Sequence, residues 1–111
     1  MNKILIAALL SLGAGAALAN QDLAQKKGCM ACHQLQTKVV GPAYKDVAAK
    51  YAKDKDAAKK LAEKVIKGGS GVWGPVPMPA NTQVSAAEAK DLAQWVLKVK
   101  QVLQVQLEQP V

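Results

Sequence analysis

Two cysteines and a histidine lie within five consecutive residues, at Cys29, Cys32 and His33. This Cys-x-x-Cys-His spacing is typical of the segment to which a c-type haem is attached covalently. Thiols three positions apart can reach the two vinyl groups on one side of a porphyrin, and the adjacent imidazole then lies under the iron. The pentapeptide therefore predicts two thioether bonds, from Cys29 and Cys32, and one axial iron ligand, His33.

Three other kinds of site share part of this pattern. A Cys-x-x-Cys pair can be a redox dithiol, but that use generally needs a βαβ context, which the sequence does not indicate. It can be half of a zinc site, but 2 Cys and 1 His fall short of four ligands unless a carboxylate contributes. It can also be a plain disulfide in an export compartment. Three observations favour haem: the complete five-residue match, the absence of other cysteines, and the pattern of an export signal at residues 1–19, which is described below.

A second axial ligand follows by elimination, because His33 is the only histidine and both thiols are used. A methionine thioether is the remaining good donor for haem iron. Met1 leaves with the export signal, and Met30 sits inside the attachment loop on the side of His33. Met78 is therefore the expected ligand, although a loop methionine more commonly fills a gap in the core.

Three prolines, Pro75, Pro77 and Pro79, alternate with other residues around Met78. Each proline fixes its own φ and pushes the preceding residue toward an extended conformation. Stiffness matters here because a weak thioether bond must offset the ordering cost of the loop. The segment therefore predicts a rigid strap that presents Met78.

Helices are the elements that must position these residues, since no strand pattern longer than a few residues is present. We expect helices over about 22–27, 43–51 and 56–67, with Asp22 and Asp56 as N-terminal caps.

A further helix is predicted near the C-terminus. Ser85-Ala-Ala-Glu88 has the spacing of a capping box. The apolar residues after it share one face of a helix: Leu92, Trp95, Val96 and Val99. Residues 101–109 read equally well as continued helix or as an alternation of apolar and polar residues.

Residues 1–19 have the pattern of an export signal. Lys3 precedes an uncharged run rich in Leu and Ala, which ends in the small-x-small pattern Ala17-Leu-Ala19. The alternative is a membrane anchor, but the run is short of the roughly 20 strongly apolar residues of a span. Cleavage would start the mature chain at Asn20, outside the cytoplasm, and thus in the periplasm of a Gram-negative bacterium.

Lysine supplies all 15 basic residues, against 8 acidic ones, for a formal net charge of +7. The absence of Arg, the usual base-reading side chain, argues against nucleic acid as a partner. The charge instead favours attraction to an acidic protein surface. Lys26, Lys27 and Lys38 are candidates for that attraction, although lysines more commonly serve solubility.

Taken together, the chain resembles the small bacterial monohaem class I cytochromes c, most closely the cytochrome c-551 type. The matching stretches are residues 28–33, 40–50, 71–79 and 95–97. The resemblance implies an all-α fold, with about four helices wrapped around one covalently attached haem c and its iron. The domain would span residues 20–111, where 101–111 run past the usual family end as an extension of unknown role. The side chains expected to pack around the ring are Tyr44, Tyr51, Leu61, Val65, Leu92, Trp95 and Val96.

The resemblance also implies supporting roles for four further residues. The carbonyl of Pro42 would accept the ring N–H of His33 that faces away from the iron, although a Gly-Pro pair can be a mere turn. Trp73 resembles an indole that donates to a haem propionate, whereas a tryptophan in such a loop otherwise tends to pack. Lys64 could approach a propionate or lie on a solvated helix face. Asn81 resembles a side chain that hydrogen-bonds the methionine sulfur, in a segment about one residue longer than the family pattern.

The expected function is single-electron transfer by a soluble periplasmic protein that is not an enzyme. The resemblance implies a quinol-oxidising complex as donor and a nitrite reductase or terminal oxidase as acceptor, each with an acidic docking surface. We expect a monomer that binds no nucleic acid and is not inserted in a membrane after cleavage. Two alternatives stay open: a haem protein with an open iron site for a gas or peroxide, and a thiol oxidoreductase without haem.

Overall fold

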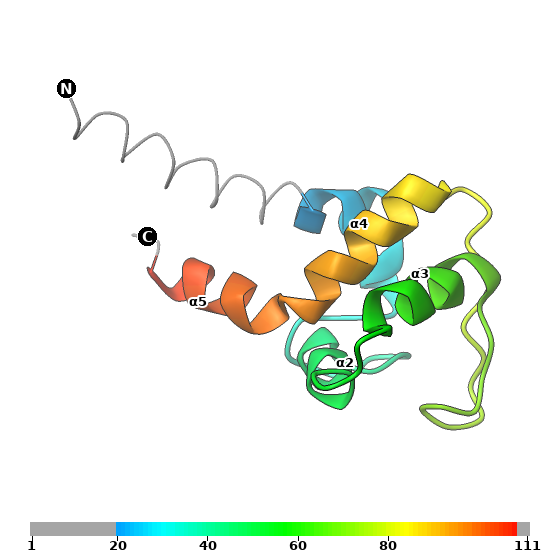
Figure 1. Ribbon diagram of the computed structural model, residues 1–111, viewed down its shortest axis with the longest axis horizontal. Helices are drawn as coiled ribbons and strands as arrows, with labels where there is room; N and C mark the ends of the chain where they lie inside the picture. Colours follow the sequence, from blue (N-terminus) through cyan, green and yellow to red (C-terminus); the bar gives the residue numbers. More distant parts are fainter. Residues whose placement is uncertain (1–19, 109–111) are drawn as a thin grey trace.

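The described part of the chain, residues 20–108 of a computed structural model, is built from helices and the loops that join them (Figure 1). Residues 20–26 are helical, and the following elements are a 3-10 helix η1 (Cys29–Ala31) and the α-helices α2 (Tyr44–Lys50), α3 (Ala57–Lys67), α4 (Ala86–Leu97) and α5 (Val99–Glu108). Within residues 20–108 there is no strand, and β-type pairing is confined to two isolated bridges, His33 with Lys38 and Gly69 with Met78. The all-α prediction is confirmed. The predicted export signal, residues 1–19, lies outside the described residues.

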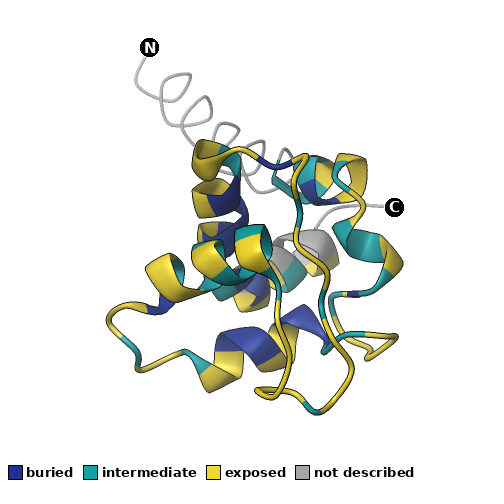
Figure 2. Cartoon of the chain, turned by 90° about the vertical axis from the view of Figure 1, so that its right-hand side faces the viewer, coloured by how far each residue is buried: buried dark blue, intermediate teal, exposed yellow. Residues whose placement is uncertain are grey.

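Helix α4 is the centre of the packing. It packs against α3, α2 and α5. The face predicted from its apolar spacing is the buried one: Leu92, Trp95 and Val96 of α4 are all at most 8% exposed, and so is Val99, which is the first residue of α5. Figure 2 shows buried residues on α2 and α4, whereas the loop after α3 is exposed over most of its length. Burial of this apolar face is the main force that holds the helices together.

The capping box at the start of α4 is confirmed. The Glu88 amide donates to Ser85 Oγ at 3.1 Å, and the Ser85 amide donates to Glu88 Oε1 at 3.0 Å. The other two predicted caps are wrong. Asp22 lies inside the helical residues 20–26, and Asp56 makes no side-chain cap to α3. Asp54 instead accepts from the Asp56 amide at 2.9 Å.

Residues 98–108 settle whether the segment after α4 is helical or alternates between apolar and polar residues in an extended form. Lys98 interrupts the helix after α4, and α5 then continues to Glu108, so the segment is helical rather than alternating. Val99, the first residue of α5, is 0% exposed, whereas Leu107 is 83% exposed. Helix α5 therefore begins in the core and extends away from the α3–α4 loop (Figure 1). Within residues 20–108, no helix combines the length and apolar character needed to cross a bilayer.

Candidate haem-binding site

A cavity of about 370 Å³ lies between α2, α3, α4 and the loop that follows α3. Cys29, Cys32 and His33 line it from one segment of the chain, and Met78 lines it from the loop. Pro42 and Trp73 also contribute to its wall. The structure thus brings the predicted thiols and both predicted axial ligands to one cavity, although His33 and Met78 are 45 positions apart in the sequence.

The two cysteines are positioned by a tight turn. Gly28 adopts a left-handed conformation (φ 82°) and η1 begins directly after it. The amides of Cys32 and His33 both donate to the carbonyl of Cys29, at 3.2 and 3.0 Å. Burial raises the pKa of the Cys29 thiol, and a hydrogen bond with Tyr44 opposes part of that rise. A dithiol built for redox exchange has a lowered pKa instead, so this environment does not favour a thiol oxidoreductase.

The imidazole of His33 is 9% exposed and is held by a backbone acceptor. Its Nδ1 lies 2.8 Å from the carbonyl oxygen of Pro42. A carbonyl can only accept, so the hydrogen bond requires the proton on Nδ1 and leaves the lone pair on Nε2. This is the tautomer that a metal-ligating histidine with a carbonyl partner adopts.

Gly41 allows this arrangement because its backbone passes directly against the imidazole. A Cβ at this residue would overlap Cε1 of His33 and lie 2.8 Å from Nδ1. The Gly41 amide also donates to the Cys32 carbonyl at 2.8 Å, which ties the two segments together. From sequence, Gly41 was only one residue of a matching stretch, and its steric role was not predicted.

An aromatic cluster supports the histidine from the core. Tyr44 stacks on the His33 ring with centroids 4.8 Å apart, and Trp95 meets Tyr44 edge-on at 5.4 Å. Burial raises the pKa of the Tyr44 hydroxyl, which therefore stays neutral. Trp95 is buried but does not line the cavity, whereas the other residues expected around the ring do: Tyr44, Tyr51, Leu61, Val65, Leu92 and Val96.

Met78 is half-buried and is anchored through its backbone. Its amide donates to the Gly69 carbonyl at 2.8 Å, and the Gly69 amide donates to the Met78 carbonyl at 2.9 Å. The competing candidate, Met30, does not line the cavity and packs against the hydrophobic core instead. The sequence predicted only a helix that ends near residue 67 and no contact of the residues after it with Met78, so this pairing was missed.

Trp73 and two lysines stand at the edge of the cavity. The indole of Trp73 is 44% exposed, and the Lys50 ammonium lies over its ring, 5.4 Å from the centroid. Lys64 lines the cavity. Lys27 is engaged elsewhere, since it donates to the Gln83 carbonyl and pairs with Glu88 at 3.4 Å.

Asn81 differs from its expected role. Its amide nitrogen donates to the Val65 carbonyl at 2.8 Å and more weakly to the Pro79 carbonyl at 3.5 Å. Its Oδ1 accepts from Gln83 at 3.1 Å. A bond to the Met78 sulfur is not among the hydrogen bonds of residues 20–108, and Asn81 does not line the cavity. The amide is turned toward the end of α3, because the carbonyls there lack partners within the helix.

These residues fit a haem. The cavity offers an imidazole with Nε2 free of the Pro42 bond and a thioether, which together form a donor pair used for haem iron. Two thiols lie in the same wall, and apolar side chains surround them. Because residue 41 is a glycine, the His33 imidazole occupies the space that a side chain at residue 41 would fill. The all-α fold and this cavity together place the protein in the class of small haem-binding electron carriers.

Comparison with known proteins agrees with this class. The Cytochrome c family model matches residues 15–100. Cytochrome c-552 of Hydrogenobacter thermophilus is 60% identical over 100 residues, which cover 90% of this chain and 100% of the relative. Cytochrome c-551 of Pseudomonas aeruginosa is 56% identical over 78 residues, covering 70% and 74%. The crystal structure of wild-type Nitrosomonas europaea cytochrome c552 matches with a TM-score of 0.70 at 61% identity, covering 71% of this chain and 98% of that one.

The chain belongs to the cytochrome c family and is similar to its small monohaem class I members. The predicted fold and the predicted resemblance are therefore confirmed. The family carries electrons by means of a covalently attached haem c with its iron, so haem c is the cofactor of this chain and electron transfer between redox partners is its class of function.

Proposed function

We propose that the chain is a periplasmic single-electron carrier whose haem iron is held by His33 on one face and Met78 on the other. Cys29 and Cys32 would form the thioether bonds. The observation that carries the proposal is the shared cavity, which His33 and Met78 both line although they come from distant segments. When bound, the haem supplies a couple that gains or loses one electron.

In this proposal the protein's own residues keep the site unchanged between the two oxidation states. The Pro42 carbonyl accepts from Nδ1 of His33, which fixes the ring and increases the electron donation of Nε2. The stacked Tyr44 and the backbone of Gly41 limit movement of the same ring. A site that moves little exchanges electrons with a small reorganisation cost.

Ligation by Met78 would also suit an electron carrier better than an enzyme, and we propose that the protein is not an enzyme. A thioether in the second axial position leaves no open coordination site for a gas or a peroxide, and a methionine raises the reduction potential relative to a second histidine. The thioether is a weak ligand, so the fraction of time that it would spend bound to iron depends on how well the strap is held in place. The backbone pairing of Met78 with Gly69 supplies such a hold.

Docking of redox partners is proposed at the exposed rim of the cavity. Val39, Val40 and Val76 are each at least 51% exposed, and Val40 and Val76 line the cavity beside Lys38. An exposed apolar rim with a cation beside it suits a brief contact with an acidic surface. Trp73 and Lys64 would face the haem propionates at the same rim, where both line the cavity.

The location and the partners complete the proposal. Residues 1–19 would be a cleaved signal peptide that exports the chain to the periplasm, and the domain would begin at residue 20. A quinol-oxidising complex would donate electrons to this monomer, and a nitrite reductase or terminal oxidase would accept them.

The decisive experiment uses the full chain matured in a host that attaches c-type haem. Mass spectrometry should find one haem added and the first 19 residues removed. The oxidised protein should show a far-red sulfur-to-iron absorption band and a low-spin spectrum. A high-spin spectrum without that band would favour the open-iron alternative, and a mass without haem would favour the thiol oxidoreductase.

A further inference from the structure

We propose that Gly68 and Gly69, at the C-terminal end of α3, position the sulfur of Met78 by holding the backbone of the strap against the helix end. The inference rests on the proposed ligation by Met78 and names the residues that make it possible. Gly68 and Gly69 are positioning residues, since they act through the strap and their own atoms make no bond to iron.

The first support is a two-way pairing of backbones. Gly69 and Met78 exchange both of their amide hydrogen bonds, at 2.8 and 2.9 Å, in an isolated antiparallel bridge. The bridge restrains the backbone on both sides of the Met78 Cα. The remaining freedom of the sulfur then lies in the side-chain torsions alone.

The second support is the closeness of the strap to Gly68. This residue has φ of +70°, and a Cβ there would overlap the carbonyl oxygen of Met78 and lie 2.8 Å from the Ala80 nitrogen. The three atoms nearest to this Cβ all belong to the backbone, so none of them can yield as the end of a flexible side chain could. Glycine is thus required at residue 68 both for the left-handed φ and for the contact.

The third support is that the strap is tied to α3 beyond Met78 as well. The backbone amide of Asn81 donates to the carbonyls of Val65 and Ile66, at 3.3 and 3.2 Å, and its side-chain amide donates to the Val65 carbonyl at 2.8 Å. These carbonyls belong to the last turn of α3 and have no partner within the helix. Residues 78–81 therefore cannot move away from Gly68 without loss of several hydrogen bonds.

Two glycines in the same loop provide the contrast. Gly71 and Gly74 also have positive φ, of +103° and +114°, but a Cβ at either would meet nothing within 4 Å. Alanine at these residues also has to adopt an unfavourable positive φ, but its Cβ would not contact the backbone of residues 78–80. They are therefore matched controls for the steric part of the proposal.

The test compares the holoprotein variants Gly68→Ala, Gly71→Ala and Gly74→Ala, with imidazole as an external ligand that competes with the methionine sulfur. In Gly68→Ala we expect the far-red band to weaken and the apparent affinity for imidazole to rise about tenfold or more, because the competent position of Met78 is less populated. The two controls should keep the band and bind imidazole like the wild type, even if their melting temperatures fall. Equal imidazole affinity in all three variants would overturn the proposal.

A measurement on the wild-type holoprotein removes any dependence on variant folding. The Met78 amide, paired with Gly69, should exchange its hydrogen about a hundredfold or more slowly than the Val76 amide, which has no hydrogen-bond partner among residues 20–108. Similar exchange at both amides would refute the clamp. An absent far-red band in the wild type would instead refute ligation by Met78, so the two failures are distinguishable.

Discussion

The backbone of Gly41 lies so close to His33 that a single methyl group between them would overlap the imidazole ring. The same ring donates from Nδ1 to Pro42, the next residue in the chain. One dipeptide therefore both accepts the hydrogen bond of the proposed ligand and limits how its ring can lie.

Replacement of Gly41 by alanine should displace the His33 ring and weaken its bond to Pro42. We expect a loss of about 1–3 kcal/mol in the free energy of unfolding, as for an overpacked site, together with a shifted haem spectrum. Denaturant unfolding and the absorption spectrum measure the two effects. Gly74→Ala, which adds a methyl group in open space, should leave the spectrum unchanged; the same spectral shift in both variants would show that the contact with His33 is not the cause.

Removal of the proposed second ligand should separate attachment from ligation. Met78→Ala should keep the haem bound through Cys29 and Cys32 but lose the far-red band, bind external ligands, and lower the reduction potential by on the order of a hundred millivolts. Met30→Ala is the matched control, because Met30 packs in the core, and it should lower stability while keeping the band. An unchanged potential in Met78→Ala would mean that another group is the ligand.

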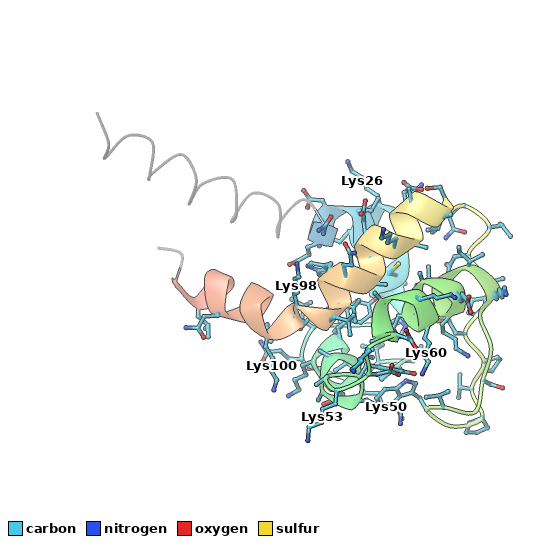
Figure 3. The ribbon with its side chains drawn as sticks, viewed as in Figure 1. Lys26, Lys50, Lys53, Lys60, Lys98 and Lys100 are labelled. Atoms are coloured by element: carbon cyan, nitrogen blue, oxygen red, sulfur yellow. The ribbon has the colours of Figure 1, made fainter. Side chains whose placement is uncertain are left out.

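Charge reversal at the rim should slow electron exchange with anions. Lys38 lines the cavity, whereas Lys53 does not (Figure 3 shows Lys53 beyond α2). Lys38→Glu should lower the rate with hexacyanoferrate(III) by about two- to fivefold at low ionic strength, and the effect should shrink with added salt. Lys53→Glu changes the net charge equally, so equal rates for both variants would refute local steering at the rim.

The capping box predicts a dependence of stability on pH. Hydrogen bonds from the Ser85 backbone and from Lys27 hold the pKa of Glu88 below its ordinary value. The folded carboxylate therefore binds a proton less readily than the unfolded one, so its stabilisation is complete above the unfolded pKa of about 4.3 and is lost as the pH falls through the lower folded value.

Glu88→Gln should remove part of this acid-side loss, since glutamine keeps the geometry of a capping box without a titrating group. Melting temperatures between pH 3 and 7 in the two proteins test this. The control Glu63→Gln changes an exposed glutamate with no hydrogen bond or ion pair in the described part of the chain. A pH profile that Glu88→Gln leaves unaltered would contradict the assignment.

The local features of the site were readable in the sequence because they depend on neighbouring residues. The spacing of Cys29, Cys32 and His33 is a property of one turn, and the capping box of Ser85 and Glu88 is a property of another. Chemistry also narrowed the choice of a second ligand to Met78, although ligation itself stays a prediction.

Contacts between distant segments could be decided only by the tertiary structure. The resemblance implied a hydrogen bond from Asn81 to the Met78 sulfur, but the carbonyls at the end of α3 accept from the backbone and side-chain amides of Asn81 instead. The steric demands at Gly41 and Gly68 arise from chains that meet only after folding. The sequence also left open whether the residues of α5 are helical, because the local pattern fits either structure. Burial of Val99 against the core favours the helix. Local composition thus determined which groups could bind a haem, and packing decided what holds each of them in place.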